Sequence, residues 1–371
     1  MRLEVAILDK EIKVDCFIDS FESNYAFSLA SSFKIDEIIN NGRKITDIHD
    51  EECYMQFRPA MKQYIIRGLE KGDLKICYSG TPVGNFAFMT DAFIHFSFYN
   101  GWYPIEKDIG SDYVVAVLVN NEYEVLHAVF DPNVKRWIYT MEDDSYKDCN
   151  IMCIHKESVF SLKSDDVSVY WFDTDKKENS EVLYCNYKEI CNYYRELYRN
   201  NKINHTDIVF VPGDYNLGAY MRKNLIVFSD MGPFTDYVHV LAHEIGHAYA
   251  SGANVDTYND WLKETHAEWS ALLYLEKHKP MLFSELERKM EADSKMIGSK
   301  LCLRECGDKR PDNVHTTGTL IYHQIYKRFG REAIKELLRI FDMLQRKDTD
   351  SFLECVAEYN HDVSDLIKTY L

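Results

Sequence analysis

The stretch that decides the fold is Tyr-Val-His-Val-Leu-Ala-His-Glu-Ile-Gly-His at positions 237–247, which ends in the motif His243–Glu244–Ile245–Gly246–His247. Two histidines four positions apart lie about 40° apart around a helix, one turn along the same face, so both imidazoles can reach one metal ion. Glu244 follows the first histidine directly, where it can take a proton from a water activated by the metal. The motif therefore predicts a helix that carries a metal centre.

The residues around the motif also favour a helix. Apolar residues at helical spacing are Tyr237, Val240, Leu241 and Ala248. We expect the helix to start near Pro233 and Thr235 and to end at Gly252, because proline fits the first turn of a helix and glycine follows the last.

A second predicted helix offers the third ligand. It begins at Asn259 or Asp260 and ends before Pro280. A mononuclear catalytic zinc takes three protein ligands and leaves one position open, and Glu264, seventeen positions after the motif, is placed to be the third. Glu268 lies one turn further along the same face, where a carboxylate would accept the proton of a ligand histidine and fix its tautomer.

Other ligand sets fit the pattern less well. The extended metzincin motif needs a glycine and a third histidine where this chain has Ala250 and Ala253. His266 points about 200° away from the glutamate around the helix, as a surface or packing residue would. His239, one turn before the motif, would close the open position, and we interpret it as a partner of a ligand or a packing residue. We expect one Zn²⁺ per chain, the metal that suits this donor set best, on His243, His247 and Glu264.

The first part of the chain has the sequence pattern of strands, and the second part has strands followed by helices. This order predicts an α+β fold. Residues 1–163 are typical of a β-sheet-rich N-terminal domain, with short apolar stretches at 5–8, 13–18, 25–29, 63–66, 74–78, 113–119 and 123–130. Residues 164–371 predict strands at 167–172, 207–211 and 224–228, a helix at 187–199 and almost only helices after 234.

The net charge and the composition of the chain exclude some classes of binding partner. The net charge of the 371 residues is −17, which disfavours binding to nucleic acid or to an anionic membrane surface. The N-terminus has no secretory signal pattern, and no apolar stretch is long enough to span a membrane. The ten cysteines are scattered and favour reduced thiols. We therefore expect a cytoplasmic protein.

The two predicted helices resemble those of the gluzincin zinc aminopeptidases of the membrane alanyl aminopeptidase type. The ligand helix of that family carries Trp-Leu-Asn-Glu-Gly-Phe-Ala, and residues 261–267 here read Trp-Leu-Lys-Glu-Thr-His-Ala. Weaker similarities are found at 78–80 with 101–104, at 187–198 and at 318–338, so the resemblance extends over most of the chain. It implies an N-terminal β-domain followed by a thermolysin-like α/β catalytic domain, and a short member without the family's C-terminal helical domain.

Two departures from the family concern catalysis and substrate. The family's catalytic tyrosine stands three residues before a glycine, and His315 stands three residues before Gly318 here. His315 could donate a hydrogen bond to a developing oxyanion, or it could be an ordinary loop histidine. The family's substrate strand reads Gly-Ala-Met-Glu-Asn, with the glutamate holding the substrate amine. The matching segment here contains Gly218, Ala219, Tyr220 and Arg222, and it offers no acid.

These residues predict a zinc metallopeptidase that is aminopeptidase-like but has an altered anchor for the substrate's N-terminus. Glu244 would be the general base, His315 the oxyanion donor, and the backbone of residues 224–228 would pair with an extended peptide substrate. The alternatives are a catalytically impaired zinc-binding protein that recognises peptides, and a zinc hydrolase of non-peptide amides.

Overall fold

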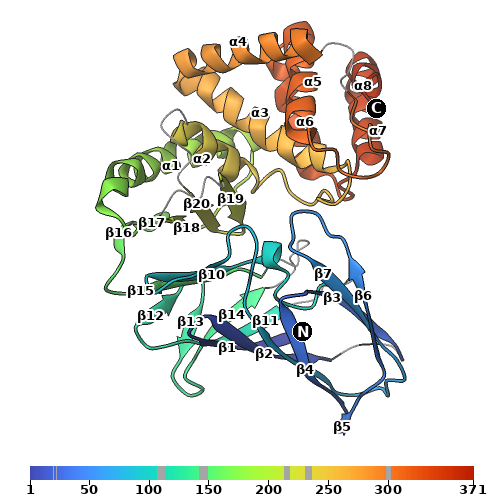
Figure 1. The fold of residues 1–371 in the computed structure, drawn as a ribbon. Helices are drawn as coiled ribbons and strands as arrows, with labels where there is room; N and C mark the ends of the chain where they lie inside the picture. The colour runs from blue at the N-terminus through green and yellow to red at the C-terminus, as the bar shows by residue number, and fades with distance from the viewer. Residues whose placement is uncertain are drawn as a thin grey trace. The chain divides into compact units, whose positions relative to one another are not determined.

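The structure is a computed structural model that describes residues 1–19, 21, 23–106, 113–141, 149–212, 218–229, 236–297 and 302–371. The chain divides into two compact units, Met1–Val159 and Phe160–Leu371. The first is built of strands, and the second combines a sheet with helices (Figure 1), so the expected α+β class is confirmed. We propose that these units are the two domains; the boundary expected at residue 163 lies four residues into the second unit.

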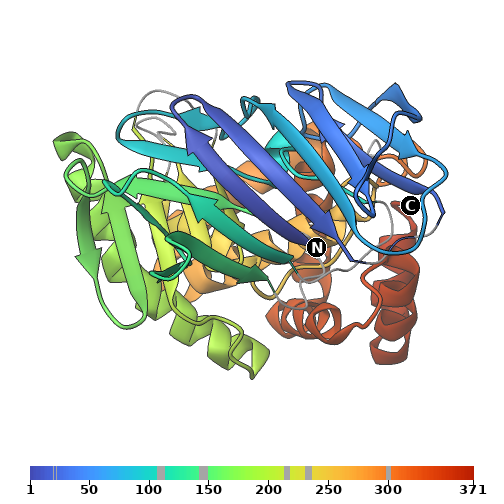
Figure 2. The same ribbon diagram turned by 90° about the horizontal axis from the view of Figure 1, so that it is seen from below.

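The described strands of the first unit form three sheets. The largest has the order β13-β14-β11-β1-β2-β8-β4-β5, and its strands lie side by side in Figure 2. The smaller sheets have the orders β12-β15-β10-β9 and β3-β7-β6. The strands are β1 (Arg2–Leu8), β2 (Glu11–Ile18), β3 (Tyr25–Ala30), β4 (Phe33–Asn40), β5 (Arg43–Lys44), β6 (Ile48–Cys53), β7 (Met61–Ile66), β8 (Leu74–Gly80), β9 (Phe88–Met89), β10 (Phe93–Phe96), β11 (Tyr113–Leu118), β12 (Tyr123–Val125), β13 (Val129–Asp131), β14 (Arg136–Met141) and β15 (Ile151–His155).

Alternation of apolar and polar residues builds the core of this unit. In β1 and β2 every second side chain is buried, among them Leu3, Val5, Ile12 and Val14, because successive side chains of a strand point to opposite faces. The strand expected at 123–130 is wrong as one element. His127 has a φ of +60°, which ends β12, and β13 then pairs in a different sheet.

The sheet of the second unit has five strands in the order β16-β17-β18-β20-β19. The middle strands β17, β18 and β20 run parallel and are buried along their length, as strands covered on both faces are. Strand β19 is an antiparallel edge strand that pairs with β20. The bounds are β16 (Phe160–Lys163), β17 (Val167–Trp171), β18 (Thr206–Phe210), β19 (Ala219–Arg222) and β20 (Leu225–Phe228).

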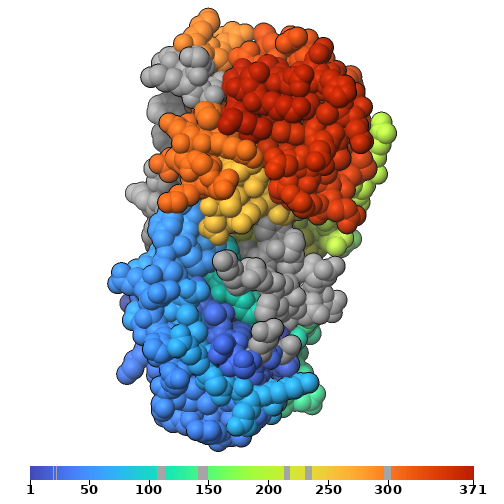
Figure 3. Space-filling view, turned by 90° about the vertical axis from the view of Figure 1, so that its right-hand side faces the viewer, coloured from blue at the N-terminus to red at the C-terminus, as the bar shows by residue number. Residues whose placement is uncertain are grey.

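Helices make up the rest of the second unit, and the C-terminal ones lie at its surface (Figure 3). Helix α3 is the centre of this part, since it contacts α1, α2, α4, α5 and α6. No helix among the described residues is both long enough and apolar enough to cross a membrane. The bounds are α1 (Lys177–Tyr198), α2 (Tyr237–Gly246), α3 (Asp260–His278), α4 (Pro280–Ile297), α5 (Val314–Phe329), α6 (Arg331–Met343), α7 (Thr349–Tyr359) and α8 (His361–Lys368).

Buried His95 on β10 makes the first unit sensitive to acid. Its side chain is fully buried with Nδ1 2.6 Å from the carbonyl oxygen of Phe86, and burial lowers the pKa of His95 to about 4. The unfolded chain takes up the proton near pH 6.5 and the folded chain only near pH 4, so stability falls as the pH falls between these values. At pH 5 the loss relative to pH 7.5 is about 2 kcal/mol.

We expect His95→Gln, whose amide can still donate to Phe86 but does not titrate, to lose this part of the pH dependence. Urea-induced unfolding of the full chain, followed by tryptophan fluorescence at pH 7.5 and pH 5 for wild type and variant, measures it. An unchanged pH dependence in the variant would show that His95 is not the group responsible.

Candidate metal centre

Helix α2 carries His243 and ends one residue before His247, whose backbone is still helical. It starts after Asp236, whose carboxylate accepts hydrogen bonds from the backbone N–H groups of Val238 at 2.9 Å and His239 at 3.3 Å. The rings of His243 and His247 lie on one face, with their centroids 4.9 Å apart and their planes at 87°.

The limits of α2 differ in part from those expected. Pro233 and Thr235, expected near the start, lie outside the described residues. The end expected at Gly252 is wrong: the helix ends at Gly246, and the chain continues in turns to Gly252, where φ is +95°.

Gly246 lets α2 and α3 come close together. A Cβ on this glycine would lie 3.0 Å from both the Cα and the carbonyl oxygen of Ala267 on α3, a distance that side chains rarely tolerate. The backbones of α2 and α3 therefore meet at Gly246, which has no side chain and directly precedes His247. This approach brings α3, and with it Glu264, up to the histidines.

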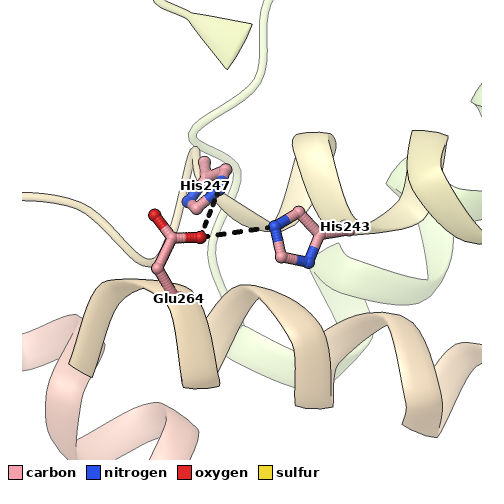
Figure 4. A group of neighbouring side chains, drawn as sticks. All are labelled: His243, His247 and Glu264. Carbon is pink, nitrogen blue, oxygen red and sulfur yellow. Dashed lines mark ion pairs between the residues drawn. The ribbon is translucent and has the colours of Figure 1, made fainter. Parts of the chain in front are cut away.

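Three donor atoms converge between the two helices. The Oε2 atom of Glu264 lies 3.5 Å from the Nε2 atoms of both His243 and His247 (Figure 4). One ligand atom of each residue lies within 4.8 Å of the others, a set that could hold a metal ion. Two imidazole nitrogens and one carboxylate oxygen are the donors of catalytic zinc sites that keep a position open.

The surroundings set the charge of each of these groups. Burial by itself would raise the pKa of Glu264, but Lys263, His247 and His315 hold it well below its usual range, so the carboxylate is ionised. Burial lowers the pKa of His247 well below its usual value. Burial opposes the charge on His243 as well, but hydrogen bonds to Glu264 and Glu268 raise its pKa well above the usual value. Metal binding would therefore release a proton from His243.

A buried chain of charges supports the other oxygen of Glu264. Its Oε1 lies 3.0 Å from the ammonium of Lys263, which also lies 2.8 Å from Oδ1 of Asp260, and Oδ2 of Asp260 lies 2.7 Å from Nε of Arg310. All four side chains are at most 8 % exposed. With Oε1 held by Lys263, Oε2 is the oxygen left to face the histidines.

Glu268 links two histidines of α2. Its Oε2 is hydrogen-bonded to Nδ1 of His243 at 2.9 Å, and its Oε1 to Nε2 of His239 at 3.0 Å. The carboxylate therefore accepts from the Nδ1 side of His243 and leaves Nε2 directed at Glu264, which is the geometry that an orienting acid gives a metal-binding histidine.

Glu244 is buried beside these residues, and its carboxylate can accept a further hydrogen bond. Only 5 % of it is exposed, and its Oε2 has no hydrogen-bond partner among the described residues. Burial raises the pKa of Glu244 to about 7, against the effect of His243, Arg222 and a hydrogen bond from the backbone of Met221. A carboxylate with such a pKa can both take up and release a proton near neutral pH.

His315 lies in the first turn of α5 and reaches the same oxygen. Its Nδ1 is 3.3 Å from Oε2 of Glu264, and its side chain is 54 % exposed. The alternative of a histidine in a loop is therefore wrong. Gly318 makes this position possible, because a Cβ there would lie 1.7 Å from Oγ1 of buried Thr265, so α5 packs against α3 only through a glycine.

The expected substrate segment forms an edge of the sheet. Gly218 precedes β19, and its carbonyl accepts from the N–H of Ser229 at 3.0 Å. Tyr220 is buried, while Ala219 and Arg222 are partly exposed. The pairing expected between residues 224–228 and a peptide is wrong: β20 lies between β18 and β19 with both edges bonded. The outer edge of β19 has no strand partner among the described residues.

The sequence predicts the residues around Oε2 of Glu264 but not those around Oε1. Lys263, Asp260 and Arg310 were not predicted as part of the site. The signal was weak: Lys263 stands where the similar family has asparagine, and a lysine beside a glutamate on a helix is usually solvated. His266, in contrast, is a packing residue, fully buried and 3.0 Å from the hydroxyl of Tyr322.

No model of a known protein family and no curated protein sequence matches this chain. Solved structures do match it. Yeast LTA4 hydrolase in complex with bestatin superposes with a TM-score of 0.71 and 11 % identity, over 99 % of this chain and 65 % of the hydrolase. A variant of an M1 zinc metallopeptidase from Deinococcus radiodurans gives 0.66 and 12 %, over 100 % of this chain and 92 % of the peptidase. This chain has their fold.

At these identities the likeness shows the fold alone. It is the M1 peptidase fold that the gluzincin resemblance implies, with a sheet-rich part first and the α/β part after it. The chain spans about two thirds of the length of the yeast LTA4 hydrolase structures, one of which is the native enzyme from Saccharomyces cerevisiae with a TM-score of 0.69 and 10 % identity.

We expect Lys263→Met to destabilise the metal-free chain more than the zinc-loaded one. Methionine fills similar space but leaves Glu264 and Asp260 without the shared ammonium, and removing one partner of a buried ion pair costs about 3–5 kcal/mol. A divalent ion on Glu264 would replace part of the lost positive charge. Urea-induced unfolding followed by circular dichroism, with chelator and with zinc, measures both losses.

Lys277→Met is the matched control, since Lys277 lies on the same helix with its side chain 47 % exposed in a surface ion pair. Such pairs contribute about 0–1 kcal/mol, so little change is expected. Equal destabilisation of the Lys263→Met chain with and without zinc would contradict the role assigned to Lys263.

Proposed function

We propose that the chain is a zinc-dependent metallopeptidase of the gluzincin family, related to the membrane alanyl aminopeptidase type. The observation that carries the proposal is the meeting of His243, His247 and Glu264 through their Nε2 and Oε2 atoms beside the buried carboxylate of Glu244. The fold shared with an M1 zinc metallopeptidase supports it. We also propose a cytoplasmic location and one catalytic zinc per chain, bound at this site. The free state of all ten cysteines is consistent with the proposed location.

The residues fit a zinc ion. His243, His247 and Glu264 would hold it, and Glu268 would fix the tautomer of His243. The positive charge of Lys263 helps to keep the carboxylate of Glu264 ionised. Zinc bound there would polarise a substrate carbonyl and make water more acidic. Glu244 would take the proton of the attacking water and deliver it to the leaving amine, as its buried position and a pKa of about 7 allow.

Two further elements would contact the substrate. His315, exposed on one side and 3.3 Å from Glu264 on the other, would donate a hydrogen bond to the oxyanion that develops on the carbonyl. The open edge of β19, with Gly218, Ala219, Tyr220 and Arg222, would bind an extended peptide by adding it as a strand. Arg222 would repel a substrate ammonium group, so the anchor of a strict aminopeptidase is altered.

The second candidate is a zinc protein that binds peptides without cleaving them. Arg222 on β19 and His315 in place of a tyrosine favour it, because both depart from the similar family at residues that act on the substrate. The retention of Glu244 beside the complete ligand set argues for catalysis.

We expect Glu244→Gln to abolish peptide hydrolysis, with a loss of at least about a hundredfold, while its zinc content stays equal to that of wild type. Glu264→Ala should lose the activity and bind about one zinc fewer per chain than wild type. Zinc is measured by mass spectrometry on protein purified without chelator, and turnover on a mixture of fluorogenic peptides. Substantial hydrolysis by Glu244→Gln would overturn the mechanism, and an equal zinc content in Glu264→Ala and wild type would overturn the ligand assignment.

We expect the chain to cleave peptides with a blocked N-terminus about as well as those with a free one, because no acid stands at the place of Arg222. Arg222→Glu should shift the preference toward free N-termini by about tenfold or more, since a carboxylate near the substrate amine adds about 1 kcal/mol or more of attraction. Arg222→Gln controls for the loss of charge alone. A wild-type preference for free N-termini above a hundredfold contradicts this prediction, and peptide binding without any hydrolysis supports the second candidate function.

A further inference from the structure

A second group of metal-type side chains lies between α4 and α5. Glu287 and Glu291 stand one turn apart on α4, so their carboxylates share a face of that helix, and His323 on α5 faces them. One ligand atom of each residue lies within 4.8 Å of the others. The group has no residue in common with the site described above.

His323 distinguishes this group from an ordinary acidic surface. Its side chain is 97 % buried, and among the described residues neither Nδ1 nor Nε2 has a hydrogen-bond partner. A buried polar group without a partner costs about 1–3 kcal/mol. Burial also lowers the pKa of His323, so the ring is neutral and has a lone pair to offer a ligand. A neutral ring close to two carboxylates can offer that lone pair to a metal ion that the carboxylates also bind.

Lys327 occupies the outer side of the group. Its ammonium lies 3.5 Å from Oε1 of Glu287 and 3.1 Å from Oε1 of Glu291, and its side chain is 51 % exposed. It therefore balances the two carboxylates from the solvent side without bonding to the ring of His323. A long, exposed side chain can move into solvent at little cost, because surface ion pairs contribute about 0–1 kcal/mol.

We propose that Glu287, Glu291 and His323 form a second metal site, which takes a divalent transition ion, zinc foremost, in exchange for the ammonium of Lys327. One imidazole nitrogen with two carboxylate oxygens suits zinc, whereas calcium and magnesium prefer oxygen ligands alone. The ion would satisfy His323 and join α4 to α5, the helix that carries His315. The chain would then hold two zinc ions in different settings.

The test is zinc binding by equilibrium dialysis against buffered free zinc, using the full chain. We expect wild type to bind about one zinc more than His323→Ala and than Glu291→Gln, since each variant lacks one of three ligands. The side chain of Glu291 is 42 % exposed, so Glu291→Gln tests the site without removing a buried side chain. Glu285→Gln, an exposed glutamate of the same helix, is the matched control and should bind as wild type does.

The variant Lys327→Met distinguishes a metal site from a histidine that only packs between the helices. If the ion and the ammonium compete for the same carboxylates, removing the ammonium should tighten binding of the second zinc by about tenfold. The differences between variants do not depend on whether the first site holds zinc, so this proposal and the proposed function can fail separately. Equal zinc content in wild type, Glu291→Gln and Lys327→Met would overturn the second site.

Discussion

The site depends on the different contacts that the two carboxylate oxygens of Glu264 make. Lys263 holds Oε1 at 3.0 Å, and this leaves Oε2 as the atom on which His243, His247 and His315 converge. A carboxylate free to rotate would present either oxygen. The buried ammonium therefore fixes both the ionisation of the ligand and its direction, before any metal is present.

The convergence of the histidines on Oε2 depends on the close packing of three helices. Glycines stand at both contacts: Gly246 where α2 meets Ala267 of α3, and Gly318 where α5 meets Thr265. Helix α3 is buried almost all round, and ion pairs join its charged residues Asp260, Lys263 and Glu264 to one another and to Arg310. Since an unpaired buried charge is costly, the charges on α3 and the close packing stabilise each other.

The sheet fixes the side from which a substrate can add. Strand β20 is enclosed by β18 and β19, so on this side of the sheet the outer edge belongs to β19. This strand contains Met221, whose backbone is hydrogen-bonded to Glu244. The residue that carries a charge on that edge is Arg222. Strand β19 thus contacts the proposed base Glu244 through Met221, and it would select the charge of the substrate through the next residue, Arg222.

The sequence by itself determined the fold class and identified the candidate ligands. Spacing placed His243 and His247 on one helix face and returned Glu264 and Glu268 on the next, because helical periodicity is a local property. Strand alternation likewise gave β1, β2, β3, β7, β8 and β11 within a few residues. Only the tertiary structure decided the strand order that makes β19 the edge, the break at His127, the role of Lys263, and the approach of His323 to Glu287 and Glu291. Each of these depends on residues far apart in the chain, and neither propensity nor spacing reports which of them meet.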